Sequence, residues 1–488
     1  MANHSSTHAA RKETPPLPDT AAFRAKLKDV MISGAVVHPI VEGGKGVAVT
    51  NGYTAGAFAA AGAVGTFSGV NADTFDKDGK AIPYQYKATT RRERHEELVA
   101  QSIRGGIQQA QIARDISGGR GRVHVNVLWE MGGCERVLTG ILEGAPGLVH
   151  GVTCGAGMPY RLSEIAEHYG IYYHPIISSA RAFNALWKRS YSKTPQLLGS
   201  VVYEDPWLAG GHNGLSNSED PKKPEDPYPR VVSLRAAMNS FGLNHVPIIM
   251  AGGAWHLREW EHWLDNPEIG PIAFQFGTRP ILTKESPVSE EWKRALPTLK
   301  EGDVFLNRFS PTGFYSSAVN NSFIKNLRNR SDRQVEYRTE QEGLFSEPLP
   351  IGPRGRPVYL QADEKPRVEQ WIAQGNTEAM KTPDSTLIFV PPEEARQIIT
   401  DQIECMGCLS HCRFSNWKDH DDYTTGKKAD PRSFCIQKTL QDIAHGSGID
   451  NELMFSGHNA YRFGKDPFYA NGHVPTIGEL VERILTGY

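Results

Sequence analysis

The sequence predicts an α/β protein built around a closed barrel of eight parallel strands, with a cysteine-rich region added towards the C-terminus. Short apolar runs alternate with amphipathic stretches from about residue 30 to about residue 285, which is the pattern of repeated strand–helix units. So many units in series favour a closed (β/α)₈ barrel, the TIM barrel, over an open sheet. The chain has 488 residues, and such a barrel takes about 250 of them. A long surplus therefore remains, and it contains four of the six cysteines.

The elements of the barrel are predicted from apolar runs and from helical periodicity. Strands are expected at residues 36–41, 64–67, 123–128, 148–153, 172–178, 198–203, 246–251 and 272–276. Helices are expected between most of them, at residues 54–63, 91–117, 161–168, 180–188, 230–241 and 255–264. Residues 217–229 form a polar loop with several prolines, and in a barrel of this kind a long loop after a strand belongs to the catalytic face.

The amino-acid composition indicates which classes of binding partner to expect. Lys and Arg number 53 against 55 Asp and Glu, and this net charge of −2 gives no electrostatic reason to expect nucleic acid or an anionic membrane. Residues 46–72 carry no charge, but they contain polar side chains and no Leu or Ile, so they are too weakly apolar to span a membrane. The first 20 residues are polar and rich in proline, without the apolar core of a targeting signal. We therefore expect a cytoplasmic protein whose partner is a small molecule.

The first candidate for catalysis is a histidine surrounded by glycines. His212 lies in the segment Ala209-Gly210-Gly211-His212-Asn213-Gly214, shortly after a predicted strand. Glycines allow close packing of the backbone against a ligand and leave the imidazole exposed at the strand end. An imidazole there can take a proton from a carbon acid, because its pKa lies near working pH. The alternative is a glycine-rich turn with an incidental histidine.

Two further loops carry the signal of a phosphate site. Gly252-Gly253 follows the strand at residues 246–251, and Gly277-Thr278-Arg279 follows the strand at residues 272–276. Free N–H groups at such positions bind phosphate, and the loops after the last strands of a TIM barrel often do so. Each loop alone has a second interpretation as simple turn geometry. Two such loops after consecutive strands favour the interpretation as a phosphate-binding site.

The motifs P-I-V-x-G-G, V-N-V, A-G-G-H, A-G-G and Q-F-G-T-R occur in an order that resembles the nitronate monooxygenase family of flavoproteins, which is similar to the flavin-dependent enoyl-acyl-carrier-protein reductases. The resemblance covers about residues 30–330, and residues 476–484 resemble the last helix of the family. It implies a TIM barrel that binds FMN non-covalently, with His212 as the catalytic base. The cofactor-binding residues that it implies are Gly43, Gly44, Asn126, Glu204, Gly211, Gly252, Gly253, Gln275, Gly277 and Thr278.

The chain departs from the family after the first barrel strand. Where the family usually has Q-A-P-M, this chain has Glu42-Gly43-Gly44-Lys45. Lys45 near a flavin would favour a reduced, anionic ring or bind an anionic substrate. The alternative is a surface lysine that points away. The difference bears on the identity of the substrate more than on the cofactor.

The residues beyond the predicted barrel include four cysteines that are candidate metal ligands: Cys405, Cys408, Cys412 and Cys435. Three cysteines within eight residues and a remote fourth suit a [4Fe–4S] cluster better than zinc, which usually takes two separated C-x-x-C pairs. The spacing is also similar to the cluster motif of iron–sulfur flavoenzymes such as 2,4-dienoyl-CoA reductase. Zinc and plain structural thiols are the alternatives.

These motifs predict an FMN-dependent oxidoreductase of the nitronate monooxygenase type, in which His212 acts on the substrate and FMN passes electrons to oxygen. One alternative is an FMN and iron–sulfur reductase of an enoyl, nitro or quinone substrate, fed by NAD(P)H or ferredoxin. Another is a non-catalytic electron-transfer flavoprotein. We expect a homodimer with three parts: a disordered arm at residues 1–25, the FMN-binding barrel at 26–330, and a cysteine-rich region at 331–488 whose final helix returns to the barrel.

Overall fold

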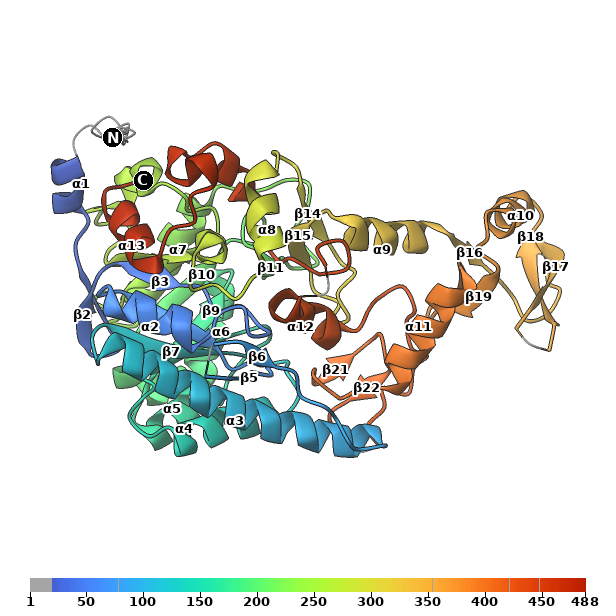
Figure 1. The fold of residues 1–488 in the computed structure, drawn as a ribbon, viewed down its shortest axis with the longest axis horizontal. Coiled ribbons are helices and arrows are strands. Elements are labelled where there is room, and N and C mark those ends of the chain that lie inside the picture. Colours follow the sequence, from blue (N-terminus) through green and yellow to red (C-terminus); the bar gives the residue numbers. More distant parts are fainter. Residues whose placement is uncertain (1–19, 78, 353, 421, 447) are drawn as a thin grey trace, which may run out of the picture.

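A closed eight-stranded parallel barrel forms the centre of the computed structural model, which describes residues 20–77, 79–352, 354–420, 422–446 and 448–488 (Figure 1). Around the barrel the strands follow the order β10-β12-β13-β3-β4-β7-β8-β9. They are β3 (Ile40–Glu42), β4 (Val64–Ser68), β7 (Arg122–Leu128), β8 (Gly151–Gly155), β9 (Tyr172–Ile177), β10 (Val201–Glu204), β12 (Ile248–Ala251) and β13 (Ile272–Phe276). The predicted TIM barrel is confirmed.

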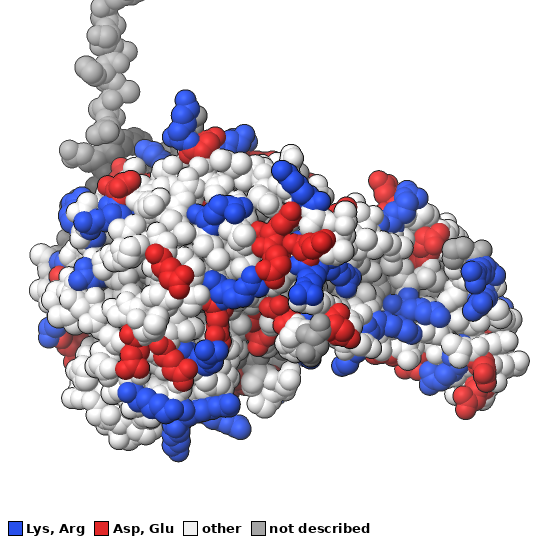
Figure 2. Space-filling model, turned by 90° about the horizontal axis from the view of Figure 1, so that it is seen from below, with Lys and Arg blue, Asp and Glu red and all other residues white. Residues whose placement is uncertain are grey.

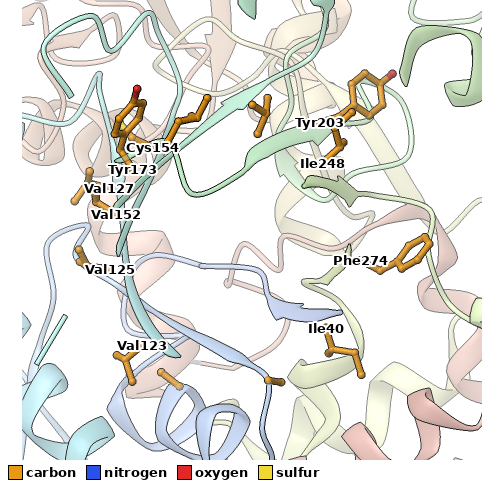
Figure 3. Packing of buried hydrophobic residues seen from close by; sticks show 14 of the residues in the cluster. Ile40, Val123, Val125, Val127, Val152, Cys154, Tyr173, Tyr203, Ile248 and Phe274 are labelled. Carbon is orange, nitrogen blue, oxygen red and sulfur yellow. The ribbon is translucent and has the colours of Figure 1, made fainter. Parts of the chain in front are cut away.

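Alternation along the strands separates two cores. Outward-facing residues such as Val125, Tyr203 and Phe274 pack under the surrounding helices (Figure 3). Inward-facing residues such as Val41, Val202 and Ile249 fill the barrel interior. Because successive side chains of a strand point to opposite faces, polar residues two positions beyond an inward-facing residue reach the mouth of the barrel.

The barrel helices are close to the predicted ones. They are α2 (Gly52–Ala60), α3 (Arg91–Ser117), α4 (Cys134–Gly144), α5 (Leu162–Tyr169), α6 (Ala180–Arg189) and α7 (Pro227–Ser240), followed by the 3₁₀ segment η3 (Leu257–Trp263). The chain returns at its end with α13 (Ile477–Leu485), which packs against α2 and adds Leu480 and Ile484 to the barrel core. Within the described ranges, none of the helices combines the length and hydropathy needed to cross a bilayer.

Two predictions near the N-terminus need correction. The strand predicted at residues 36–41 is broken at His38-Pro39: β2 (Ala35–Val37) pairs with β1 (Val30–Ile32), and only β3 enters the barrel. Pro39 has no N–H to donate to a sheet, which explains the break. Of the predicted arm at 1–25, residues 1–19 lie outside the described residues. From Thr20 the chain is helical as α1 (Thr20–Lys26), and Phe23 is buried against Arg258.

After the barrel, the chain builds a small cap and a distal lobe. The strands β14 (Val304–Asn307) and β15 (Ser316–Val319) form a sheet with β11 (Gly211–His212). Beyond α8 (Glu290–Ala295) and α9 (Ser322–Asp332), the lobe projects away from the barrel with its own core around Leu360 and Phe389 (Figure 1). Its elements are β16 (Gln334–Glu336), β17 (Phe345–Ile351), β18 (Arg356–Gln361), α10 (Lys365–Ala373), β19 (Glu378–Lys381), β20 (Thr386–Val390) and α11 (Pro392–Ile403).

The cysteine-rich segment returns from the lobe to the barrel through β21 (His411–Cys412), β22 (Trp417–Lys418) and α12 (Ile436–His445). Two 3₁₀ segments, η6 (His458–Gly464) and η7 (Pro467–Gly472), lead on to α13. Figure 2 shows acidic and basic side chains interspersed on the face seen from below, over both the barrel and the lobe, in keeping with the net charge of −2.

Candidate active site

A cavity of about 370 Å³ lies at the carboxyl ends of the barrel strands. Its wall comes from the ends of all eight barrel strands or the loops that follow them, together with segments from the last hundred residues of the chain. Every cofactor-binding or catalytic residue proposed from the sequence lies in that wall: Gly43, Gly44, Asn126, Glu204, Gly211, His212, Gly252, Gly253, Gln275, Gly277 and Thr278.

His212 is held by the cap over the barrel. It lies in β11, which pairs with β15 of the cap, and its ring meets the ring of Phe455 edge to face at 5.3 Å between centroids. Its Nε2 is 2.6 Å from Ser310 Oγ. Burial lowers the pKa of His212 to about 4, so the imidazole is neutral at neutral pH. A neutral imidazole with one nitrogen fixed by a hydroxyl is suited to accept a proton on the other nitrogen.

Three polar side chains form the floor of the cavity, each two positions beyond an inward-facing residue of its strand. Asn126 donates from Nδ2 to Thr153 Oγ1 at 3.0 Å. Gln275 is the penultimate residue of β13, with its Nε2 close to Gly43. Glu204 ends β10, and burial raises the pKa of its carboxyl to about 8, with a smaller contribution from Asp205. Glu204 is therefore largely protonated at neutral pH and can donate a hydrogen bond.

Glycines at the cavity allow the backbone to come close to its neighbours and leave room for a ligand. A Cβ on Gly44 would collide with the side chain of Asn126, whereas a Cβ on Gly277 would meet nothing within 4 Å. Gly252 and Gly253 have φ of +93° and +80°, a region that residues with a Cβ rarely adopt. The two predicted phosphate loops thus combine strained turn geometry with open space.

A late segment of the chain, residues 455–459, connects these loops. Gly457 N donates to Thr278 Oγ1 at 2.9 Å, and Asn459 Nδ2 donates to Gly253 O at 2.5 Å. Phe455 of the same segment contacts His212. The only local signal in the sequence is a glycine between polar residues, which many surface turns share.

Arg279 has a different role from the one predicted. Its guanidinium is buried and donates from Nη1 to Trp255 O at 2.9 Å and from Nε to Tyr469 Oη at 3.2 Å. Its Nη2 lies 3.6 Å from the carboxylate of Asp466. Arg279 therefore ties the η7 segment to the barrel, since its charge is matched by Asp466.

The four cysteines of the surplus come together in one buried cluster, although they are separated by up to thirty residues of sequence. All four are free thiols. Burial and the neighbouring thiols raise the pKa values of Cys408 and Cys412. Among the described residues, no group of three or more His, Cys, Asp or Glu side chains has the arrangement of a metal-ion site, so the predicted cluster is not confirmed.

The cysteine cluster borders the cavity. Cys408 and Leu409 line it, as do Ile436, Gln437 and Leu440 of α12. Main-chain bonds fix this wall to the barrel, because Gly132 N donates to Cys408 O at 3.0 Å and Ser410 N donates to Glu130 O at 2.8 Å. The cysteine-rich segment therefore forms part of the cavity wall.

Comparison with known proteins agrees with this architecture. The model of the family described as nitronate monooxygenase matches residues 28–390. The enoyl reductase domain of MlnA from Bacillus amyloliquefaciens is similar with a TM-score of 0.52 at 12% identity, over 92% of this chain and 93% of that chain. FabK from Thermotoga maritima gives a TM-score of 0.50 at 13% identity, over 92% of both chains.

A comparison with curated protein sequences gives no match. At identities this low, the two solved structures show the fold alone, whereas the family model covers most of the chain. The chain belongs to the nitronate monooxygenase family, and the expectation of an FMN-dependent oxidoreductase on a TIM barrel is confirmed at the level of family and fold.

Proposed function

We propose that the protein oxidises a nitronate or a similar carbon acid with FMN as its resident cofactor. The observation that carries this proposal is that His212, neutral and fixed by Ser310, shares one cavity with two glycine loops suited to a phosphate. FMN, when bound, accepts the electron pair of the substrate and passes it to oxygen.

The residues present fit FMN. Gly277 leaves open space where a side chain would stand, and the loop at Gly252 and Gly253 adopts a turn that only glycine adopts readily. Main-chain N–H groups in such loops bind a phosphate. On the barrel floor, Asn126 and Gln275 offer amide groups to the polar edge of a flavin.

The protein's own contribution to the reaction is proton transfer and exclusion of water. When Nε2 of His212 carries the proton and donates to Ser310 Oγ, Nδ1 is the nitrogen that can accept the α-proton of a neutral nitro compound or a similar carbon acid and so form its anion; a nitronate taken up from solution has already lost that proton. The ring contact with Phe455 holds the imidazole plane. Glu204, kept protonated by burial, adds a hydrogen-bond donor to the floor without adding negative charge.

Anaerobic mixing tests this proposal directly. The purified protein should show a flavin absorption spectrum, and heat release should yield free FMN. An alkyl nitronate added without oxygen should bleach the flavin, and admission of oxygen should restore the colour. Bleaching by a reduced nicotinamide or a reduced ferredoxin but not by the nitronate would contradict the proposal and favour a reductase.

One observation favours that second candidate, an FMN and iron–sulfur reductase. The sulfur of Cys405 accepts two hydrogen bonds, from Ser415 Oγ at 3.0 Å and from Gly407 N at 3.5 Å. Hydrogen bonds to ligand sulfurs are among the features that tune an iron–sulfur cluster.

In this reductase the four cysteines would be the ligands of a [4Fe–4S] cluster, with zinc as the alternative; as described, they are free thiols. A cluster would supply one-electron chemistry beside the cavity that Cys408 lines. Iron and acid-labile sulfide at about four each per chain would support it. Zinc without sulfide would support the structural alternative, and neither metal would leave plain thiols. The homodimer expected from the sequence remains a prediction, which light scattering can test.

A further inference from the structure

Lys45 is fixed in the cavity wall by its own backbone. Its N–H donates to Thr50 Oγ1 at 2.8 Å, and its C=O accepts from Thr50 N at 3.1 Å. The preceding Gly43 N donates to Phe276 O at 2.9 Å. The side chain lines the cavity and is partly buried, with Nζ donating to Gly43 O at 3.1 Å. The alternative of a surface lysine pointing away is therefore wrong.

The ammonium of Lys45 makes no ion pair in the described part of the chain, and the carboxyl of Glu42 acts on it only at longer range. No carboxylate oxygen there lies within the 4.0 Å of an ion pair with Nζ. Glu42, the nearest acid in sequence, is fully buried behind the wall, where Oε2 accepts from Thr66 N and Oε1 has no partner. Burial lowers the pKa of Lys45 to about 8, and Glu42 opposes that change, so Lys45 is still mostly charged at neutral pH.

The other ionisable groups of the cavity do not neutralise Lys45. Burial keeps Glu204 protonated and His212 neutral. Arg279 is matched by Asp466. Burial raises the pKa of Glu42 to about 7, so Glu42 offsets only part of the charge of Lys45, and a partly buried cation with an incomplete counter-charge is costly. An anionic ligand beside Nζ removes that cost, and two of the three N–H bonds of the ammonium remain for it.

We propose that Lys45 binds the anionic group of the substrate, so that the cavity selects a planar oxyanion such as a nitronate over the neutral nitro compound. This inference rests on the proposed function, because it names the charge state of the substrate of that same site. The same ammonium chemistry would also suit the anionic edge of a reduced flavin, and the experiment separates the two sources.

Nitrate is the probe, because it is a planar, singly charged oxyanion. Calorimetric titration of the FMN-loaded protein should show nitrate binding that weakens at least tenfold in Lys45→Met and in Lys45→Gln, the loss of one charge-assisted bond. Lys45→Arg should stay within about threefold of the wild type. Lys365→Met, which removes a lysine of the distal lobe paired with Glu347, should leave binding unchanged.

Kinetics and redox potential give independent readouts. In Lys45→Met, the KM for an alkyl nitronate should rise at least tenfold with a smaller change in kcat, while FMN content stays that of the wild type. Equal nitrate affinity in the wild type and Lys45→Met would overturn the inference. So would a fall in the flavin midpoint potential with nitrate binding intact, since that result assigns Lys45 to the flavin.

Failure of the proposed function has a different signature. If nitrate binding depends on Lys45 but no nitronate reduces the flavin, the anion site stands and the nitronate reaction is excluded. If the wild type binds FMN but no nitrate, the anion site is excluded whatever the nitronate does.

Discussion

Both ends of the barrel contain buried ionisable groups, but at one end these groups have hydrogen-bond partners within the protein, whereas at the other end they have few. Towards the amino ends of the strands, His124 and His174 stack with 4.3 Å between ring centroids. Ser33 Oγ lies 2.8 Å and 2.9 Å from their two Nε2 atoms, and Ser200 Oγ lies 2.6 Å from His174 Nδ1. Only Nδ1 of His124 lacks a partner in this group.

At the mouth, Lys45, Glu204 and His212 line open space, and the protein supplies each with few partners. Glycines show the same contrast. At the base, Gly151 and Gly199 make room for the ring of His174, whereas Gly277 at the mouth faces nothing within 4 Å. Polar groups satisfied within the protein stabilise the fold, whereas groups left short of partners beside a cavity are available to a ligand.

The largest expected effect comes from removing the base at the mouth. His212→Ala should lower the rate of flavin reduction by a neutral nitroalkane by about 10²- to 10⁴-fold, the usual contribution of a positioned proton acceptor, whereas reduction by a preformed nitronate, which has no α-proton to lose, should change much less. FMN content should not change, because the imidazole is not part of the phosphate loops. Stopped-flow absorbance under anaerobic conditions measures the rate, and an unchanged rate would remove His212 from the mechanism.

The buried pair His124 and His174, at the amino ends of the barrel strands, should make the fold sensitive to acid. Burial lowers the pKa of His174 to about 3 and that of His124 well below its usual value, whereas both titrate near 6.5 in the unfolded chain. Below pH 6.5 the unfolded chain therefore binds more protons, and stability falls as pH falls, by about 2 kcal/mol per histidine between pH 6.5 and pH 5.

Urea unfolding at pH 7.5 and pH 5 measures that loss. His212 and several other histidines also have lowered pKa values, so the contribution of His124 and His174 is the difference between proteins with and without these two residues, measured in a His212→Ala background. Adding His124→Gln and His174→Gln should flatten the pH dependence even if the variant is less stable at both pH values. The same pH dependence with and without these two histidines would show that His124 and His174 do not cause it.

A smaller effect is expected at residues 455–459, which hydrogen-bond to both predicted phosphate loops. Asn459→Ala removes the donor to Gly253 O and should weaken FMN binding about fivefold, the loss of one neutral hydrogen bond. Fluorescence titration of the apoprotein with FMN measures this, and Asn376→Ala in the distal lobe is the control. Unchanged affinity would mean that the late segment is not part of the FMN site.

The smallest effect at neutral pH is expected from Glu204→Gln. An amide resembles the protonated carboxyl that burial maintains, so kcat at pH 7 should change by less than about twofold. In the wild type the rate should fall above about pH 8 as Glu204 loses its proton, and the variant should lack that alkaline limb. A pH–rate profile with the same limb in both proteins would assign it to another group.

Much of the barrel and of its mouth could be predicted because the signals are local. Strand alternation, the glycine pairs after two consecutive strands and the glycines around His212 are each contained within a few residues. The order of these motifs also carried the resemblance to the family. The break at His38-Pro39 was predictable in principle from the proline, whereas nothing in the pattern of residues 20–25 pointed to a buried Phe23.

The sequence by itself determined the closed barrel, the loops that turn back over it, and the residue types at the mouth, because these depend on periodicity and backbone geometry. Only the tertiary structure decided that Leu409, Gln437 and Asn459 complete the cavity, that Arg279 is matched by Asp466, and that Lys45 lines the cavity without an ion pair. Those outcomes depend on which distant segments pack together and on how deeply each charge is buried, and neither is encoded in any local run of residues.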